Sequence, residues 1–322
     1  MPALPAGATP LSRSIDLRPR SYGCLVNAFW DRWRKQLTEP SRPSRAATGA
    51  LAPHLIDHVR DVLGATATPC AIIGIAGAAT DPTQSFLTGH PYLPAGSTWP
   101  EGRHGPQVFV AQINFAEVGQ LPGFPTSGLL QWFVDPDDSY GLTFDDTAGA
   151  TGFSVRWYPE PSAPSLARPD APTPVDQAEE VPMEFVGPTA VTFRPGASIP
   201  SWDELPAALR QDTVWERVAM AFGENRSEPA FVYDEYVRGG TAVLPDNGTG
   251  SKIGGYPTFT QQDPRGSGDY PEPGTPAAGL LIELDSMDVG GWGDSGVAHL
   301  FGDPVALARG DLSGIRYHWD CM

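Results

Sequence analysis

The chain has few cysteines, few basic residues and no long apolar run. Its three cysteines, Cys24, Cys70 and Cys321, are odd in number and far apart, so they supply neither a disulfide framework nor the paired spacing of a zinc site. No stretch approaches the roughly 18 continuous apolar residues of a membrane span, and the first residues lack the parts of a signal peptide. We therefore expect a cytoplasmic protein with reduced thiols, no metal and no membrane partner.

Basic residues are outnumbered: Lys and Arg total 21 against 38 Asp and Glu, which gives a net charge of −17. Phosphate backbones repel such a surface, so we expect no nucleic-acid partner. A basic protein or a cationic ligand fits the charge. Plain solubility is the simpler explanation, because net charge is first a statement about solubility.

What the chain has in abundance is glycine and proline, 36 and 35 among 322 residues. Both residues disfavour helices, while 40% hydrophobic residues indicate an ordinary globular core. We expect many short strands joined by ordered turns.

Two parts of the sequence also resemble each other. Ser85-Phe-Leu-Thr-Gly-His-Pro91 corresponds to Ser251-Lys-Ile-Gly-Gly-Tyr-Pro257, and Ser127–Pro136 corresponds to Ser295–Pro304 at nearly the same spacing. Such self-similarity predicts a duplicated unit. We place repeat one at about 83–158 and repeat two at about 250–322, with a surface linker at 159–182, and we expect them to share one core.

Hydrophobic spacing predicts the elements. An amphipathic helix is expected at about 23–37 in an N-terminal region of residues 1–70, and a second one ends at Gly64. Ser201 and Glu204 form a capping box, which predicts a helix beginning at Trp202. Pro206 falls within this segment, so either one helix or two short ones are expected, and the last helix should end near Gly223. Strands are expected at 71–76, 108–115, 129–134, 153–158, 190–193, 280–284, 297–301 and 315–319. The predicted fold class is α+β and strand-rich, with two intertwined β-repeats in one core and flanking helices.

Two strands carry matching polar residues. Gln112 and Asn114 in repeat one align with Glu283 and Asp285 in repeat two, and alternation places each pair on one face of a strand. The two pairs either line one cleft or form two solvent-facing rows.

The second repeat resembles the YwqG-like bacterial domain of unknown function. It matches the pattern Lys-x-Gly-Gly-Tyr-Pro-x-Phe-x-Gln-x-Asp-x-Arg at 252–265, a Trp-Gly-Asp-x-Gly turn at 292–296 and a Tyr-x-Trp-Asp-Cys tail at 317–321. Repeat one matches more loosely and has Phe86 where the pattern has lysine. The resemblance covers residues 71–322 and implies a duplicated α+β fold with no established activity.

The densest polar cluster lies in repeat two. Arg265 and Lys252 are suited to holding a carboxylate or phosphate, and the same residues are also suited to an internal ion-pair network. The ligand-binding candidates are Lys252, Gln261, Asp263, Arg265, Asp285 and Asp294.

No motif predicts catalysis. Gly293-Asp-Ser-Gly296 lacks the following glycine of the trypsin-like pattern, and the acidic clusters lack the spacing of a Ca²⁺ loop. No cofactor is expected, and whether the chain is an enzyme stays open. The first hypothesis is a non-catalytic binding or immunity-like protein that docks a basic partner through its acidic surface. The alternative is a small-ligand-binding protein or enzyme with a polar site between the repeats.

Overall fold

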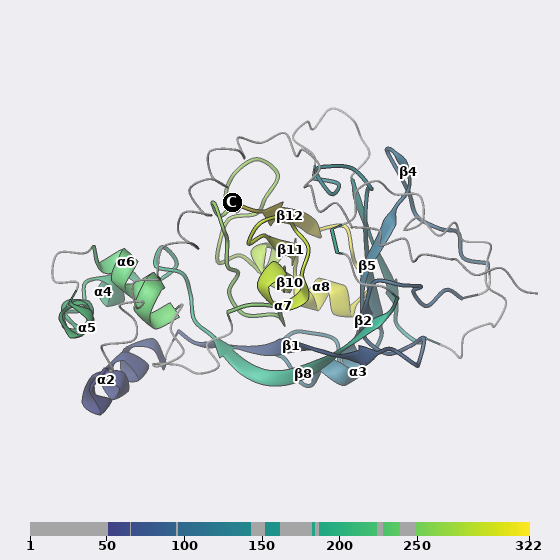
Figure 1. Cartoon of the computed structure of the whole chain (residues 1–322). Helices are drawn as coiled ribbons and strands as arrows, with labels where there is room; N and C mark the ends of the chain where they lie inside the picture. The colour runs from purple at the N-terminus through teal and green to yellow at the C-terminus, as the bar shows by residue number, and fades with distance from the viewer. Residues whose placement is uncertain are drawn as a thin grey trace, which may run out of the picture. The chain divides into compact units, whose positions relative to one another are not determined.

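The computed structural model (Figure 1) describes residues 51–64, 66–94, 96–142, 152–161, 182–183, 187–223, 228–238 and 249–322. The predicted arm, the helix at 23–37 and most of the predicted linker lie outside these ranges. None of the helices within them has the length and apolar character needed to cross a bilayer.

Ten strands form one sheet in which every neighbouring pair is antiparallel. In spatial order they are β12 (Arg316–Asp320), β11 (Val297–Phe301), β10 (Leu280–Asp285), β9 (Lys252–Ile253), β1 (Thr68–Ala78), β8 (Thr189–Ser198), β2 (Phe86–Leu87), β5 (Val108–Asn114), β6 (Leu129–Val134) and β7 (Phe153–Tyr158). A small hairpin pairs β3 (Glu101–Gly102) with β4 (Gly105–Pro106). The strand-rich α+β prediction is confirmed at this level.

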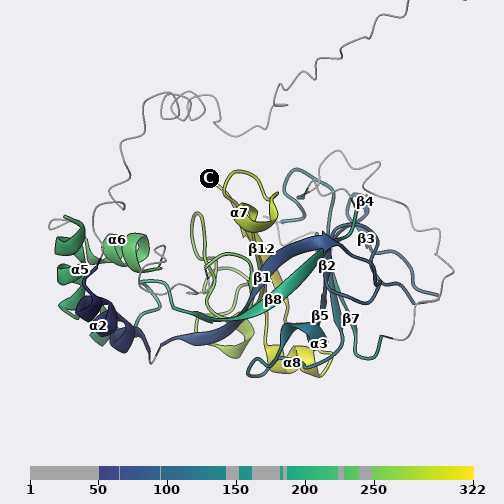
Figure 2. The ribbon, with the colours of Figure 1, turned by 60° about the horizontal axis from the view of Figure 1, so that its bottom comes forward.

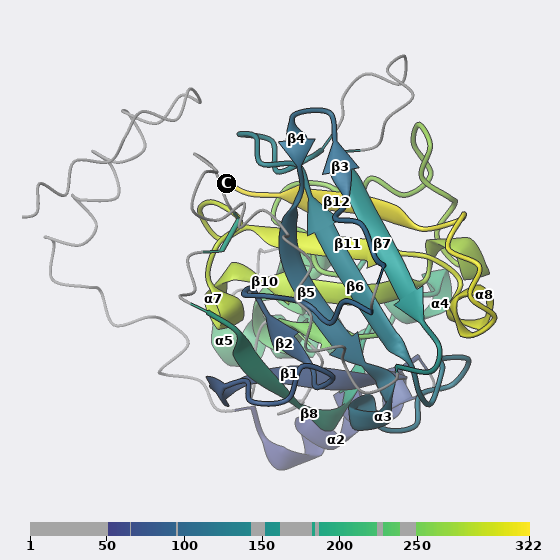
Figure 3. The ribbon, with the colours of Figure 1, turned by 90° about the vertical axis from the view of Figure 1, so that its right-hand side faces the viewer.

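The long strands β1 and β8 form a central ribbon, visible in Figure 2, with four strands attached on each side. Figure 3 shows β5–β7 lying across β10–β12. Side chains from both groups meet in one apolar core, where Trp132 stacks on Trp292 with 5.6 Å between ring centroids and also contacts Tyr317. Strands β5, β6, β10 and β11 are buried nearly throughout, which explains their almost continuous apolar sequences.

The longer helices have a separate apolar cluster. It joins α2 (Pro53–Gly64), α5 (Val214–Phe222) and α6 (Pro229–Tyr233), which continues as a π-helix over Asp234–Arg238. Helix α5 ends at Gly223, whose φ of 75° is the left-handed conformation that favours glycine. The predicted stop at Gly223 is therefore confirmed.

Short helices follow several strands. They are α3 (Phe115–Val118) after β5, α7 (Ser286–Val289) after β10, α8 (Pro304–Ala308) after β11, α4 (Ala207–Arg210) and a 3₁₀ turn at Pro276–Ala278. The sequence patterns did not predict α3, α7 or α8, because four or five residues are too few to show a 3.6-residue period.

The predicted helix start at Trp202 is wrong. The reciprocal bonds of a capping box do form, with Ser201 N 3.4 Å from Glu204 Oε2 and Glu204 N 3.3 Å from Ser201 Oγ. The next residues nevertheless form a turn, and α4 begins only at Ala207. Pro206 explains the difference, since it has no N–H to donate and disfavours helical backbone in the residue before it.

Candidate functional site

The six predicted site residues do not meet at one point. Lys252 lies in the buried strand β9, whereas Asp294 lies in an exposed turn. Arg265 belongs to the long loop that follows β9, and Asp285 ends β10. The contacts of each residue show what it does in the fold.

Lys252 and Glu283 form a fully buried ion pair. The Lys252 ammonium contacts the Glu283 carboxylate directly, and it also donates to the carbonyl of Gly250 at 3.3 Å. Neither side chain has any exposed surface. Lys252 lies on strand β9, between β1 and β10. Its ammonium is therefore held by internal partners and is not exposed to a ligand at the surface.

Glu283 is the centre of a larger buried group. Its carboxylate accepts from Thr258 N at 2.8 Å and from Thr258 Oγ1 at 2.6 Å, and His299 Nε2 lies 3.4 Å from its Oε2. His299 Nε2 also lies 2.7 Å from the carbonyl of Thr258. Burial by itself raises the pKa of Glu283, but the Lys252 charge and His299 outweigh it and hold that pKa at about 2. The carboxylate is thus ionised at neutral pH.

Arg265 anchors the long loop. Its guanidinium forms a bidentate pair with Asp263 at 2.9 and 2.6 Å and reaches Glu204 at 2.8 Å. The same group lies over the rings of Phe259 and Phe301, 5.7 Å from each centroid. The side chain is only 4% exposed. Arg265 therefore joins the loop, the segment before α4 and the sheet.

The other candidates have local roles. Gln261 donates its backbone N–H to Asp320 at 2.6 Å and its side-chain amide to the Cys321 carbonyl. Asp285 is the N-cap of α7, because its Oδ1 accepts from Met287 N at 2.8 Å. Burial raises the pKa of Asp285. The Asp294 side chain accepts from Ser295 Oγ at 3.3 Å.

The first half holds an uncharged group with the same geometry. Gln112 Oε1 accepts from Tyr92 N at 2.9 Å, as Glu283 accepts from Thr258 N. Gln131 donates to the Tyr92 carbonyl at 2.6 Å and to Gln112 Oε1 at 2.9 Å, in the position that His299 takes in the second half. The residues at Gln112 and Glu283 therefore neither line a cleft nor face solvent. They fix a loop to the sheet.

Further contacts are repeated beside these groups. Asn114 N donates to Ser85 Oγ at 2.8 Å, and Asp285 N donates to Ser251 Oγ at 2.9 Å. Asn114 caps α3 as Asp285 caps α7. Each of these serines also donates its backbone N–H to a carboxylate of the short helix. Ser85 N donates to Glu117 at 2.8 Å, and Ser251 N donates to Asp288 at 2.6 Å.

Three polar atoms near His299 are buried without a hydrogen-bond partner among the described residues: His299 Nδ1, His318 Nε2 and Asp320 Oδ1. His299 on β11 stands opposite His318 on β12, with their rings stacked 5.9 Å apart. Burial, followed by the nearby His299, lowers the pKa of His318 to about 3. The sequence could not indicate this pair, because the register between β11 and β12 decides which residues stand opposite each other.

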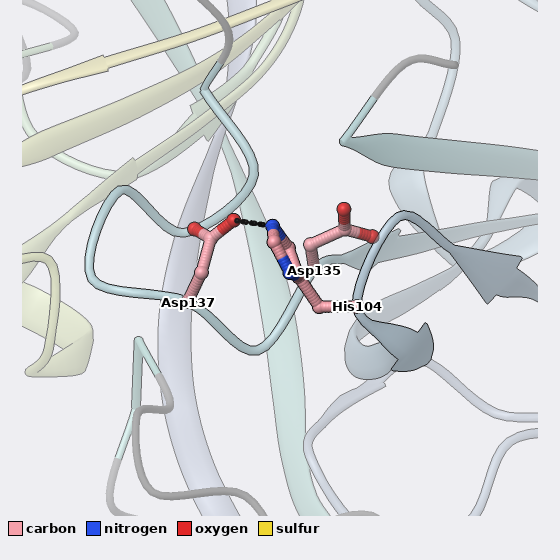
Figure 4. Close-up of side chains that lie close together, drawn as sticks. All are labelled: His104, Asp135 and Asp137. Carbon is pink, nitrogen blue, oxygen red and sulfur yellow. Dashed lines mark ion pairs between the residues drawn. The ribbon is translucent and has the colours of Figure 1, made fainter.

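One other group has the residue types of a metal site. His104, Asp135 and Asp137 have potential ligand atoms within 4.8 Å of one another, and Figure 4 shows the ion pair of His104 with Asp137. Arg103 donates through N and Nε to Asp135 at 3.1 and 3.3 Å, and Asp137 accepts from Ser139 and Gly141. Arg103 would compete with a cation for the same carboxylates, so we assign no metal here.

Taken together, these contacts define an α+β protein in which paired polar side chains fix two loops onto one ten-stranded sheet. The chain belongs to the family described as "Domain of unknown function (DUF1963)", whose model matches residues 85–321. No curated protein matches the chain.

Proposed function

We propose that this chain is a non-catalytic binding protein that docks a basic partner through its acidic surface. The distribution of exposed charge carries the proposal. Among the lysines and arginines of the described ranges, only Arg60, Arg194 and Arg309 are exposed. Exposed acidic residues occur throughout the fold: Asp57, Asp61, Asp81, Glu101, Glu117, Asp138, Glu160, Asp203, Glu216, Glu228, Asp234, Glu235, Asp263, Asp269, Glu272, Asp288, Asp294 and Asp311.

Two basic residues are paired with carboxylates within the fold, Lys252 with Glu283 and Arg265 with Asp263 and Glu204. These pairs do not make the surface more negative, because each contains at least as many carboxylates as cations. The acidic surface rests on the exposed carboxylates, which outnumber the exposed arginines in the described ranges. A surface of one sign attracts an oppositely charged protein and accelerates its association. A basic toxin is one class of partner that such a surface suits, and this chain would then act as its immunity protein.

Immobilised protein tests this proposal. Cell extract is passed over it at low and at high salt, and bound proteins are identified by mass spectrometry. We expect partners with a basic isoelectric point whose retention falls as salt rises, because screening weakens contacts between exposed charges. A partner retained equally at both salt concentrations, or no partner at all, contradicts the proposal.

A small-ligand site is the second candidate, and the atoms His299 Nδ1, His318 Nε2 and Asp320 Oδ1 favour it. Buried polar atoms without a partner are uncommon and call for an explanation. The ligand-binding candidates Gln261 and Asp263 lie in the loop beside them, since Gln261 N donates to Asp320. Thermal-shift screening of wild type and His318→Phe against small polar metabolites tests this candidate. A compound that stabilises only the wild type supports it, and no stabilising compound argues against it.

The repeated contacts support a finer description of the fold. We infer that the chain holds two copies of one β-unit, each a long strand, a two-residue strand and a three-stranded meander. The copies interlock, since β1 pairs with β9 of the second copy and β8 pairs with β2 of the first. We also propose that the chain is YwqG-like and that it is located in the cytoplasm.

A further inference from the structure

One edge of the central ribbon is only partly covered. Strand β8 pairs with β1 from Thr189 to Ser198, but on its other side β2 pairs only with Thr189 and Ala190. A last bond on that side runs from Val191 N to the Ser85 carbonyl at 3.2 Å. Beyond Val191, no strand in the described ranges pairs with this side of β8. An open strand edge of this kind can accept a strand from another chain.

The backbone direction along this edge follows from alternation. Successive residues of an antiparallel strand direct their N–H and C=O groups to opposite sides. Since Val191 N points toward β2, the N–H and C=O of Phe193 and the C=O of Pro195 point to the same, uncovered side. Proline has no N–H to donate and is found on strand edges for that reason. The backbone N–H of Phe193 is therefore the hydrogen-bond donor that β8 offers on this side between Val191 and Pro195.

A pocket lies where β2 separates from β8. It has a volume of about 510 Å³ and is open to solvent. Its walls are residues of β8, of the loop before β2 and of α3: Val191, Thr192, Phe193, Asp81, Thr83, Gln84 and Glu117. The pocket thus continues the line of β2 along the uncovered edge, with apolar side chains from β8 on one wall.

The opposite wall is negatively charged. Asp81 and Glu117 are both exposed, and no lysine or arginine lines the pocket. Hydrogen bonds from Thr83 lower the pKa of Asp81, and Glu117 is held in place by the N–H of Ser85 at 2.8 Å. Arg194, the next residue along β8, is exposed. The acidic part of the edge therefore lies at its β2 end.

We propose that an extended basic segment of a partner protein adds to the edge of β8 as a further strand. Its backbone pairs with Phe193, its basic side chains contact Asp81 and Glu117, and an apolar side chain rests on the half-buried Phe193. Main-chain pairing supplies affinity in such strand addition, and the pockets for alternate side chains supply specificity. The identity of the partner as basic rests on the proposed function, whereas the location at β8 does not.

A fluorescent peptide of alternating arginine and valine is the probe, with fluorescence polarisation as the readout. We expect it to bind the full chain. The same peptide with glutamate in place of arginine, or with N-methylated valines that cannot pair, should bind at least about tenfold more weakly. Replacing Asp81 and Glu117 by Asn and Gln should weaken binding by a similar factor. The matched control is Asp269→Asn with Asp311→Asn, which neutralises exposed carboxylates that do not line the pocket and should leave affinity unchanged.

Phe193→Pro tests the backbone contact. It removes the outward N–H while the bonds between β8 and β1 are retained, as they are around the natural Pro195. Phe193→Ala removes the same ring but keeps the N–H, so it is the matched control. We expect the proline variant to lose binding and the alanine variant to keep part of it. Hydrogen exchange of the wild type gives a second measurement, in which the peptide should slow exchange at Phe193.

The outcomes separate the two proposals. If basic peptides bind but neither the Phe193 nor the Asp81/Glu117 changes matter and exchange at Phe193 is unaltered, the β8 inference is wrong and the proposed function stands. If neither the peptide nor any basic protein binds, both are wrong. If Phe193→Pro alters the oligomeric state without altering peptide affinity, the edge serves a second copy, which also overturns the inference.

Discussion

The loops at Tyr92 and Thr258 are held by the same backbone contacts and by different chemistry. In the first half, two neutral amides, Gln112 and Gln131, bond to Tyr92 and to each other. In the second half, Glu283 and His299 make the matching contacts to Thr258. A lysine is added there, at the position where the first half has Phe86.

The comparison separates what both loops require, the positions of a hydrogen-bond acceptor and donor, from what differs between them, the charge of the side chains. Each loop needs one acceptor for its N–H and one donor for its C=O, and either pair supplies both. The amide pair carries no charge. The carboxylate is costly to bury unless a cation lies beside it, which accounts for Lys252. The buried ion pair is therefore a consequence of Glu283 and is weak evidence for a catalytic site.

The largest expected effect comes from removing the cation. Lys252→Met keeps the length of the side chain but leaves the Glu283 carboxylate buried without its partner. We expect a loss of about 3–5 kcal/mol in the free energy of unfolding, measured by urea denaturation. A loss below about 1 kcal/mol would show that water reaches Glu283 and that the pair is not truly buried.

Converting the second group to the chemistry of the first is the control. The triple variant Lys252→Phe, Glu283→Gln and His299→Gln places the residues of the first half around Thr258. It should recover most of the stability that Lys252→Met loses, because no buried charge is left. A triple variant as unstable as the single variant would show that the two groups are not interchangeable.

The reverse change gives the next effect. Gln112→Glu places a carboxylate beside Gln131 and Phe86, with no cation in contact. We expect a loss of about 3 kcal/mol at neutral pH that shrinks as the pH falls below the pKa of the new carboxyl. Urea denaturation at neutral and acid pH measures both quantities. A loss independent of pH would point instead to steric strain or to the two hydrogen bonds that the Gln112 amide donates to the carbonyls of Pro82 and Gln84.

Acid pH should destabilise the second half through Glu283 and His318, with a loss of unfolding free energy similar to that of Gln112→Glu. The pKa of Glu283 is about 2 in the fold against an ordinary value of 4.5, so its contribution is present above pH 4.5 and is lost as the pH falls toward 2. This amounts to about 3 kcal/mol. His318, whose pKa is lowered to about 3 from 6.5, adds a loss that begins near pH 6.5. The double variant Lys252→Met with Glu283→Gln, which leaves no unpaired buried charge, should remove the first part and keep the second, and an unchanged acid profile would contradict the assignment.

The smallest effects are expected at the two helix caps. Asn114→Ala and Asp285→Ala each remove one acceptor for the first N–H groups of α3 and α7. Loss of the cap should cost about 1 kcal/mol in each case, measured as a shift in the urea midpoint, and Asn114→Asp keeps the cap acceptor while removing the bond from the Asn114 amide to the Thr83 carbonyl. Nearly equal losses would support equivalent halves, while a loss at only one cap would separate them.

Much of the strand pattern was predictable. The bounds of β6, β7 and β11 agree with the expected strands. The buried strands β6 and β11 leave clear apolar runs between turns, and the half-buried β7 alternates apolar residues with Ser154 and Arg156. The helix start at Trp202 was wrong, since a local capping signal does not outweigh Pro206. The tiny strands β2 and β9 could not be found, because two residues carry no period and their pairing depends on β8 and β1.

The candidate site was harder to predict. The sequence indicated Lys252, Arg265 and Asp263 as a dense polar cluster and offered an ion-pair network as one reading of it. The contacts of Arg265 with Asp263 and Glu204 and of Lys252 with Glu283 could not be assigned, because Glu204 and Glu283 come from distant segments. Only the folded chain brings these carboxylates within reach, Glu283 on strand β10 and Glu204 in the turn before α4.

By itself the sequence determined a glycine- and proline-rich, acidic, strand-rich chain with two similar segments, since these follow from composition and short-range spacing. Only the tertiary structure decided that Gln112 and Glu283 are buried loop anchors, and that part of β8 beside Asp81 and Glu117 has no neighbouring strand within the described ranges. The reason is physical: the environment of a polar side chain is set by its neighbours across the sheet, and strand register brings those neighbours together from far along the chain.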